Sequence, residues 1–207
     1  MYKYEETLLS QGHLYIAGCD EVGRGPLAGP VVASAVILDP KYTIVGLNDS
    51  KKLSEKKRNE LYQEILQHAL AIKTVFIEAE EIDRINIYQA SKKAMIDAIN
   101  DLEIKPTYIL SDAMPLSELG IPYESIIKGD TKSATIAAAS IVAKVVRDQY
   151  MVDLAKEYPD YGFERHKGYP TKAHKEALIK YGITPYHRKS YAPVQDVIYK
   201  QQRLKII

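Results

Sequence analysis

Apolar positions along this chain recur with two periods, which predict strands and helices. Alternating or β-branched runs predict strands over residues 15–19, 31–38, 72–79, 107–111 and 121–128. Apolar residues three or four positions apart predict helices over residues 55–69, 80–100, 131–157 and 171–181, and a last short helix after Pro193. Strands mixed with helices predict a layered α/β fold with a helical C-terminal region.

The segment 131–157 is the longest predicted helix. Its first half is apolar on nearly every face, which is typical of a buried helix, and Pro159 ends it. From Tyr158 onward the composition shifts to tyrosine, histidine and basic residues. We therefore expect a core of residues 1–157 and a C-terminal basic, tyrosine-rich helical region of residues 158–207, packed together as a single compact unit.

The composition excludes several classes of protein. With 46% hydrophobic residues, 27% charged residues and a net charge of +1, the 207-residue chain is neither disordered nor strongly basic. Its single cysteine, Cys19, excludes an intramolecular disulfide and a multi-cysteine zinc site. Residues 1–13 lack the apolar segment of a signal peptide, and the longest apolar stretch, 136–146, is too short and too charged to span a bilayer. We expect a soluble, cytoplasmic, monomeric protein with no membrane contact.

The stretch from Gly18 to Pro30 is the one around which the chain is organised. Adjacent carboxylates, Asp20 and Glu21, precede the tripeptide Gly23-Arg24-Gly25. Neighbouring residues of a strand point to opposite faces, so the two carboxylates share a site only if the chain bends there. Glycine is used where a chain turns sharply or where another group approaches its backbone. The glycine spacing approaches a dinucleotide-binding fingerprint, but that motif requires a helix afterwards and a strand follows here.

Three places along the chain put carboxylates where strands end or a helix begins. Asp20 and Asp112 each follow a predicted strand, and Asp130 precedes the long helix. Separately, these residues are explained as turn residues and a helix N-cap. Together with Glu21 they predict one acidic site, whose mutual repulsion would resist ionisation unless divalent cations are bound. Oxygen ligands favour Mg²⁺ or Mn²⁺, and two such ions would clamp a phosphodiester.

Five motifs occur in one order between about Tyr15 and Pro193. They are Asp20-Glu21-Val22-Gly23-Arg24-Gly25-Pro26-Leu27-Ala28-Gly29-Pro30, Asn48-Asp49-Ser50-Lys51-Lys52-Leu53, Lys128-Gly129-Asp130, Ile136-Ala137-Ala138-Ala139-Ser140-Ile141-Val142-Ala143-Lys144-Val145 and His166-Lys167-Gly168-Tyr169. In this combination the chain resembles the ribonuclease HII family. The resemblance implies a ribonuclease H-like fold, with a central five-stranded mixed sheet flanked by helices, in which residues 1–157 form the catalytic core.

The resemblance also implies an activity and the residues that carry it. It implies endonucleolytic cleavage of RNA paired with DNA, and cleavage of duplex DNA on the 5′ side of a single embedded ribonucleotide, leaving 5′-phosphate and 3′-hydroxyl ends. Asp20, Glu21, Asp112 and Asp130 would bind two Mg²⁺ or Mn²⁺ ions. Gly23, Arg24 and Gly25 would read the 2′-hydroxyl and the adjacent phosphate, and Tyr169 would stack on the sugar. Lys51 would either contact the nucleic-acid backbone or solvate its loop.

Three alternatives concern function and partners. A catalytically inactive module that binds RNA–DNA hybrids would keep the recognition residues without the chemistry. An enzyme acting on small phosphorylated substrates would not need segment 156–189, where eight Lys and Arg residues against four Asp and Glu residues predict salt-sensitive duplex binding. The terminal residues 201–207 weakly resemble a tail that binds a sliding clamp, without its aromatic anchors.

Overall fold

The computed structural model describes residues 1–204 and the side chains of residues 1–201. Its helices and strands, in chain order, are α1 (Lys3–Ser10), β1 (Ile16–Val22), β2 (Val31–Leu38), α2 (Glu55–His68), β3 (Ala69–Ile77), α3 (Ala79–Ile85), α4 (Ile87–Asn100), β4 (Tyr108–Asp112), β5 (Tyr123–Ile126), α5 (Ala134–Glu157), α6 (Phe163–His166), α7 (Lys172–Tyr181) and α8 (Ala192–Leu204). Short 3-10 turns are η1 (Ser117–Leu119), η2 (Gly129–Thr131) and η3 (Pro159–Tyr161). No helix in this described part is both long and apolar enough to cross a bilayer.

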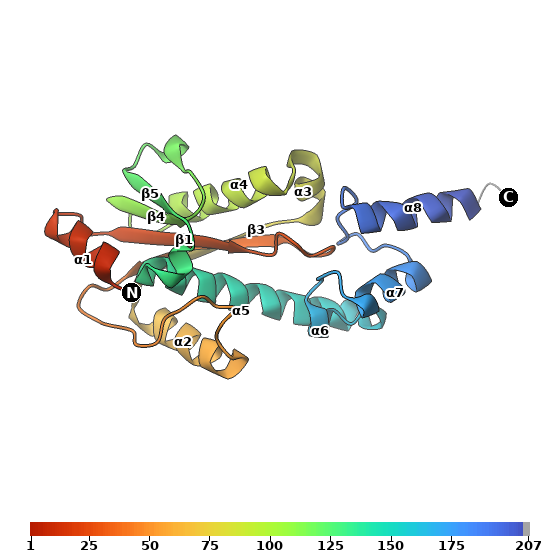
Figure 1. Ribbon diagram of the computed structural model, residues 1–207, viewed down its shortest axis with the longest axis horizontal. Coiled ribbons are helices and arrows are strands. Elements are labelled where there is room, and N and C mark those ends of the chain that lie inside the picture. The colour runs from red at the N-terminus through yellow and green to blue at the C-terminus, as the bar shows by residue number, and fades with distance from the viewer. Residues whose placement is uncertain (205–207) are drawn as a thin grey trace. The chain divides into compact units, whose positions relative to one another are not determined.

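The strands form one mixed sheet in the order β3-β2-β1-β4-β5 (Figure 1). β1 pairs antiparallel with β2, while it pairs parallel with β4, and β4 pairs parallel with β5. The predicted α/β class and the five-stranded mixed sheet are therefore confirmed.

The first strand extends further than its sequence predicts. Its pairing with β4 ends at Cys19, but its pairing with β2 continues to Val22, opposite Val32. The carboxylates Asp20 and Glu21 therefore lie inside β1 rather than after it, because β2 continues to supply hydrogen-bond partners. Helix α5 begins three residues later than predicted, at Ala134, because η2 occupies the segment that contains Asp130.

Local capping explains several boundaries that the sequence predicts correctly. The Ser54 hydroxyl accepts a hydrogen bond from the backbone nitrogen of Lys57 at the start of α2. Thr171 caps α7 in the same way. The segment 80–100, predicted as helix, is divided into α3 and α4 at Asn86, which has a φ of 69°. Of the apolar residues of α2, Leu61 and Ile65 are fully buried, whereas Leu66 is 46% exposed.

The chain groups into two compact units that interleave in sequence. The first contains residues 1–22, 32–76 and 91–145, and the second contains residues 23–31, 77–90 and 146–207. The boundary expected between residues 157 and 158 follows a change in composition and stays a prediction. In the second unit, Met151, Leu154 and Phe163 pack with Ala28 in a core that lies outside the sheet.

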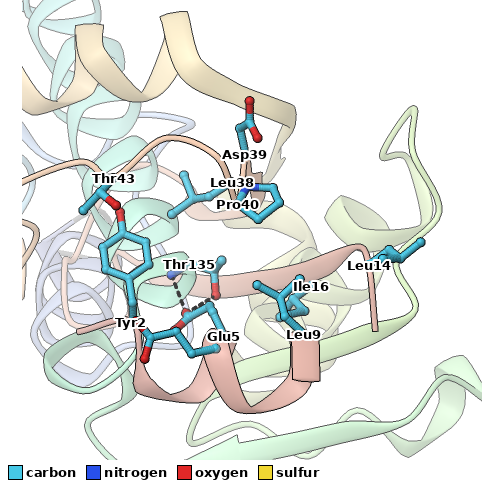
Figure 2. A pocket seen from close by; sticks show the side chains of 11 residues that line it. Tyr2, Glu5, Leu9, Leu14, Ile16, Leu38, Asp39, Pro40, Thr43 and Thr135 are labelled. Atoms are coloured by element: carbon cyan, nitrogen blue, oxygen red, sulfur yellow. Dashed lines mark hydrogen bonds between the residues drawn. The ribbon is translucent and has the colours of Figure 1, made fainter. Parts of the chain in front are cut away.

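Helix α1, which the pattern of apolar residues does not reveal, is fixed by packing and by one buried carboxylate. Its Leu8 packs with Ile16, Leu110 and Ile136 in the first unit. Glu5 is 6% exposed, and its Oε1 accepts hydrogen bonds from the Ser133 hydroxyl (2.6 Å) and from the backbone nitrogen and hydroxyl of Thr135 (both 2.9 Å). Figure 2 shows this carboxylate at the start of α5, beside a cavity of about 170 Å³. Glu5 thus ties α1 to the N-terminus of α5, where a negative charge is stabilising.

Candidate active site

Three carboxylates from separate elements of the first unit form one acidic cluster. Asp20 lies in β1, Asp112 ends β4 and Asp130 lies in η2. One carboxylate oxygen from each lies within 4.8 Å of those of the other two. Asp20 and Asp130 are only 4% and 6% exposed. The structure thus brings together three of the four acidic residues that the sequence predicts.

The alternation of side chains along β1 explains how Asp20 reaches this cluster. Asp20 shares a face of the strand with Gly18, two residues earlier. A Cβ added to Gly18 would lie 2.1 Å from the carbonyl carbon of Thr135, so glycine is required for α5 to approach β1 so closely. The hydroxyl of Ser140, further along α5, then donates a hydrogen bond to Asp20. Close contact between strand and helix therefore positions the first carboxylate.

A hydrogen bond links Asp112 to the turn η2, which carries Asp130. Oδ1 of Asp112 accepts from the backbone nitrogen of Gly129 at 2.8 Å. Gly129 is buried against Ile126 and Ile136, and a Cβ there would lie 2.6 Å from Cδ1 of Ile136. The preceding Lys128 has a φ of 57°, so the chain turns sharply before Asp130. The end of β4 and the turn η2 are thus held together as one structure.

Burial and mutual repulsion make the cluster a poor place for unbalanced negative charge. Burial raises the pKa of Asp20 well above its usual range, and the charges of Glu21 and Asp112 raise it further. Burial also raises the pKa of Asp130, with smaller contributions from Asp112 and Asp49. Buried carboxyl groups with only oxygen donors are the ligands that Mg²⁺ and Mn²⁺ prefer, so the residues present fit a divalent cation.

Glu21 and Lys51 lie at the edge of this arrangement. Glu21 is half-buried in β1, and its backbone nitrogen donates to Oδ1 of Asp20 at 2.7 Å, but it is not a member of the cluster of three. Its charge nevertheless raises the pKa of Asp20, so its carboxylate lies within electrostatic reach of the cluster. Lys51 is exposed, and its charge lowers the pKa of Asp130.

The loop between β2 and α2 also contributes polar groups that the sequence does not assign to the site. The hydroxyls of Ser50 and Ser140 lie 3.0 Å apart, and Nη1 of Arg58 donates to the carbonyl of Ser50 at 2.7 Å. Asp49 is near enough to Asp130 to raise its pKa. The available signal was Ser140 itself, a polar residue that interrupts an otherwise apolar helical run.

The predicted substrate-reading residues belong to the second unit. Arg24 and Gly25 are exposed, whereas Gly23 is buried. The ring of Tyr169 lies beside Gly25, because a Cβ added to that glycine would be 3.7 Å from Cε1 of the tyrosine. The backbone nitrogen of Leu27 donates to the carbonyl of Gly168 at 2.8 Å, which holds the loop of residues 23–31 next to the segment that carries Tyr169.

A buried histidine cluster supports the Tyr169 segment, and sequence reasoning missed it. His174 lies in α7 and is fully buried. Its Nδ1 lies 3.0 Å from the carbonyl of Tyr169, and its Nε2 lies 3.1 Å from Nε2 of His187. The ring of His166 stacks on that of His174 at 4.5 Å. Burial lowers the pKa of His174 to about 4 and that of His187 to about 3, so both rings are neutral near neutral pH.

Comparison with known proteins decides the class to which this site belongs. A family model described as Ribonuclease HII matches residues 17–194, which include every residue of the acidic cluster. This chain belongs to the ribonuclease HII family. It is therefore an enzyme of the ribonuclease H type, a class of metal-dependent hydrolases that acts on nucleic acid.

Curated relatives and solved structures agree with this assignment. Ribonuclease HII from Bacillus mycoides is 57% identical over 200 residues, covering 97% of this chain and 77% of the relative. The enzyme of the same name from Bacillus cytotoxicus is 56% identical over 198 residues, covering 96% of this chain and 76% of the relative. The ribonuclease H2 structure from Pyrococcus horikoshii is 26% identical with a TM-score of 0.79, covering 91% of this chain and 99% of that one. The ribonuclease HII from Archaeoglobus fulgidus, solved in a complex with PCNA, is 29% identical with a TM-score of 0.74, covering 86% and 95%. The predicted ribonuclease H-like fold is thus confirmed.

Proposed function

We propose that this enzyme cleaves the RNA strand of RNA–DNA hybrids and cuts duplex DNA on the 5′ side of a single embedded ribonucleotide, leaving 5′-phosphate and 3′-hydroxyl ends. The cluster of Asp20, Asp112 and Asp130 carries this proposal, because three carboxylates within 4.8 Å of one another in a ribonuclease H-type enzyme suit phosphodiester hydrolysis.

The acidic residues would bind divalent cations. Asp20, Asp112 and Asp130 would hold them together with Glu21, which lies next to Asp20 in β1. When bound, two Mg²⁺ or Mn²⁺ ions would neutralise the carboxylates, stabilise the charge that develops on the phosphodiester and lower the pKa of an attacking water. The buried walls of the cluster strengthen the attraction between these carboxylates and a cation.

The residues of the second unit would supply selectivity for RNA. The 2′-hydroxyl distinguishes a ribonucleotide from a deoxyribonucleotide. The backbone amides of the exposed residues Arg24 and Gly25, following Gly23, would bind that hydroxyl and the adjacent phosphate, while the ring of Tyr169 would stack on the sugar. In the first unit, the exposed Lys51 would bind a backbone phosphate.

One cleavage assay tests the reaction and the cation requirement together. An end-labelled DNA duplex with a single ribonucleotide would be incubated with Mg²⁺, with Mn²⁺ and with EDTA, and the nick would be mapped to the nucleotide. We expect a cut immediately 5′ of the ribonucleotide with either cation and no cut in EDTA. An Asp112→Asn variant should lose cleavage and still bind the duplex. If the wild type binds the duplex but cuts nothing with either cation, the alternative of an inactive hybrid-binding module replaces this proposal.

A sliding-clamp contact is a separate and testable proposal. The Archaeoglobus fulgidus relative was solved in a complex with PCNA. In this chain the candidate segment is 201–207, and its side chains after Gln201 lie outside the described residues. Deleting residues 201–207 should abolish binding to a clamp in a pull-down with purified proteins while cleavage of the duplex continues. Unchanged clamp binding by the truncated protein would exclude this segment.

A further inference from the structure

Arg188 is a fully buried arginine whose guanidinium is aimed at the backbone of the substrate-reading loop. Its Nη2 donates to the carbonyl of Gly23 at 2.6 Å, and its Nη1 donates to the carbonyl of Arg24 at 2.9 Å. Nε and Nη2 also donate to the carbonyl of Gly29 at 3.0 and 2.8 Å. One side chain therefore fixes three carbonyl groups between Gly23 and Gly29.

These bonds determine which way the neighbouring amide groups point. In a planar trans peptide, the C=O of one residue and the N–H of the next point in opposite directions. Because the carbonyl of Gly23 points at Arg188, the N–H of Arg24 points away from it. By the same reasoning, the N–H of Gly25 points away from the guanidinium, because the carbonyl of Arg24 points towards it.

A tyrosine reinforces the same orientation. The hydroxyl of Tyr191 accepts a hydrogen bond from Nη1 of Arg188 at 3.0 Å and donates one to the carbonyl of Arg24 at 2.6 Å. The carbonyl of Arg24 therefore has two donors, both from the C-terminal segment of the second unit. The φ of Gly23 is 93°, a conformation that glycine adopts readily, so the loop turns at the residue whose carbonyl Arg188 binds.

We propose that Arg188, with Tyr191, is a positioning residue for RNA selectivity, because it holds the amides of Arg24 and Gly25 outward to meet the 2′-hydroxyl and the adjacent phosphate. This inference rests on the proposed function and deepens it. Arg188 itself is buried and touches no substrate; it acts through the peptide groups that it orients. Its buried positive charge also lies behind these amides, where it favours an anionic phosphate.

The test compares two duplexes that differ by a single hydroxyl. Dissociation constants would be measured in EDTA for a DNA duplex with one ribonucleotide and for the same duplex made only of DNA. The dissociation constant for the all-DNA duplex divided by that for the ribonucleotide duplex gives a ratio that reports recognition of the 2′-hydroxyl without cleavage. We expect Arg188→Lys to lower this ratio about tenfold and Tyr191→Phe to lower it about threefold, with affinity for the all-DNA duplex changed much less.

Tyr161→Phe is the matched control. Tyr161 is buried in the same unit and donates one hydrogen bond, to the carbonyl of Gly182 at 2.8 Å, so the substitution removes an equivalent tyrosine–carbonyl contact away from the loop. It should leave the ratio unchanged. If Arg188→Lys does not fold, Tyr191→Phe still carries the test, because it keeps the packing of the ring.

The outcomes separate this inference from the proposed function. Equal losses of affinity for both duplexes, a ratio that stays at the wild-type value, or an equal effect of Tyr161→Phe would overturn the role of Arg188 alone. A wild-type protein that binds both duplexes equally and cuts neither would overturn the proposed function as well.

Discussion

At the scale of single residues, the acidic cluster lowers the stability of the folded protein, but it suits the binding of a divalent cation. Asp20 is almost completely buried next to other carboxylates, so its charged form is unfavourable until a cation is present. Residues selected for function often reduce stability in this way.

An Asp20→Asn variant should therefore be more stable than the wild type without divalent ions. Asparagine keeps an oxygen that can accept from the backbone nitrogen of Glu21, and it removes the repulsion. We expect a gain of about 1–2 kcal/mol in the free energy of unfolding in EDTA, measured by urea denaturation. In Mg²⁺ the gain should shrink, because a bound cation stabilises only the wild-type site.

Asp101→Asn is a control for this measurement. Asp101 is exposed on the surface, where it forms a 3.4 Å ion pair with Lys73, so its substitution should change stability by less than about 0.5 kcal/mol with or without Mg²⁺. A loss of stability for Asp20→Asn in EDTA would contradict the idea that the cluster is strained.

The sequence predicts some of these site residues and not others. The difference is the separation along the sequence between the residues that form each contact. Asp20, Asp112 and Asp130 could be predicted because strands and helices next to them follow from local patterns. That β1 continues to Val22, with Glu21 outside the cluster of three, could not be predicted. Nor could the role of Arg188, because its acceptor on Gly23 is 165 residues away and no local pattern marks that pairing.

At the scale of elements, the contact between β1 and α5 depends on one glycine. A Cβ on Gly18 would lie 2.1 Å from the carbonyl carbon of Thr135 and 2.4 Å from the backbone nitrogen of Ile136. Backbone atoms cannot swing aside as a side chain can. Gly18→Ala should therefore lower the free energy of unfolding by about 3 kcal/mol or more, measured by urea denaturation.

Gly12→Ala is the matched glycine substitution. A Cβ on Gly12 would meet no atom within 4 Å, although its φ of 92° adds strain of about 1 kcal/mol. If Gly18→Ala lowers the free energy of unfolding no more than Gly12→Ala does, α5 can move away from β1 with little loss of stability.

The link between α1 and α5 depends on Glu5. Removing this carboxylate deprives the backbone nitrogen and hydroxyl of Thr135 of the acceptor drawn in Figure 2. The buried hydroxyl of Ser133 loses the same acceptor. We expect Glu5→Ala to lower the free energy of unfolding by about 3 kcal/mol. Glu6→Ala, on the exposed side of the same helix, should change it by less than about 0.5 kcal/mol, and similar losses for both variants would contradict this role.

Helix α1 also shows why some elements could not be predicted. It has only eight residues, so its own propensity does not suffice to form it. Its stability comes from Leu8 in the core and from Glu5 at α5, and neither contact is visible in a local pattern. Helices α2 and α7 were predictable because Ser54 and Thr171 cap them within their own sequence.

At the scale of the whole molecule, the buried histidines of the second unit make folding sensitive to acid. The folded state holds His174 and His187 neutral, with pKa values of about 4 and about 3, while in the unfolded chain a histidine titrates near 6.5. Below pH 6.5 the unfolded state therefore binds more protons. As the pH is lowered from about 6.5, the free energy of unfolding should fall by up to about 1.4 kcal/mol per pH unit for each histidine. The fall should stop once the pH is below the pKa of that histidine in the folded state.

Urea denaturation between about pH 7.5 and about pH 4.5 would measure this loss. The double variant His174→Gln, His187→Gln should be less stable at neutral pH, and its free energy of unfolding should depend less steeply on pH. The same slope in the wild type and in the double variant would mean that other groups cause the acid sensitivity.

The distribution of charge leads to a prediction about binding. The net charge is only +1, but segment 156–189 has eight Lys and Arg residues against four Asp and Glu residues, and Lys175 is exposed on α7 within it. If this segment binds phosphates, the logarithm of duplex affinity falls linearly with the logarithm of salt concentration, by about 0.9 for each phosphate contact. Lys175→Ala should reduce that slope by about 0.9 and weaken binding to any duplex sequence equally.

Lys41→Ala removes the same charge from an exposed position in the first unit and should leave the slope unchanged. Equal changes for both variants would mean that the overall charge, rather than this segment, governs binding.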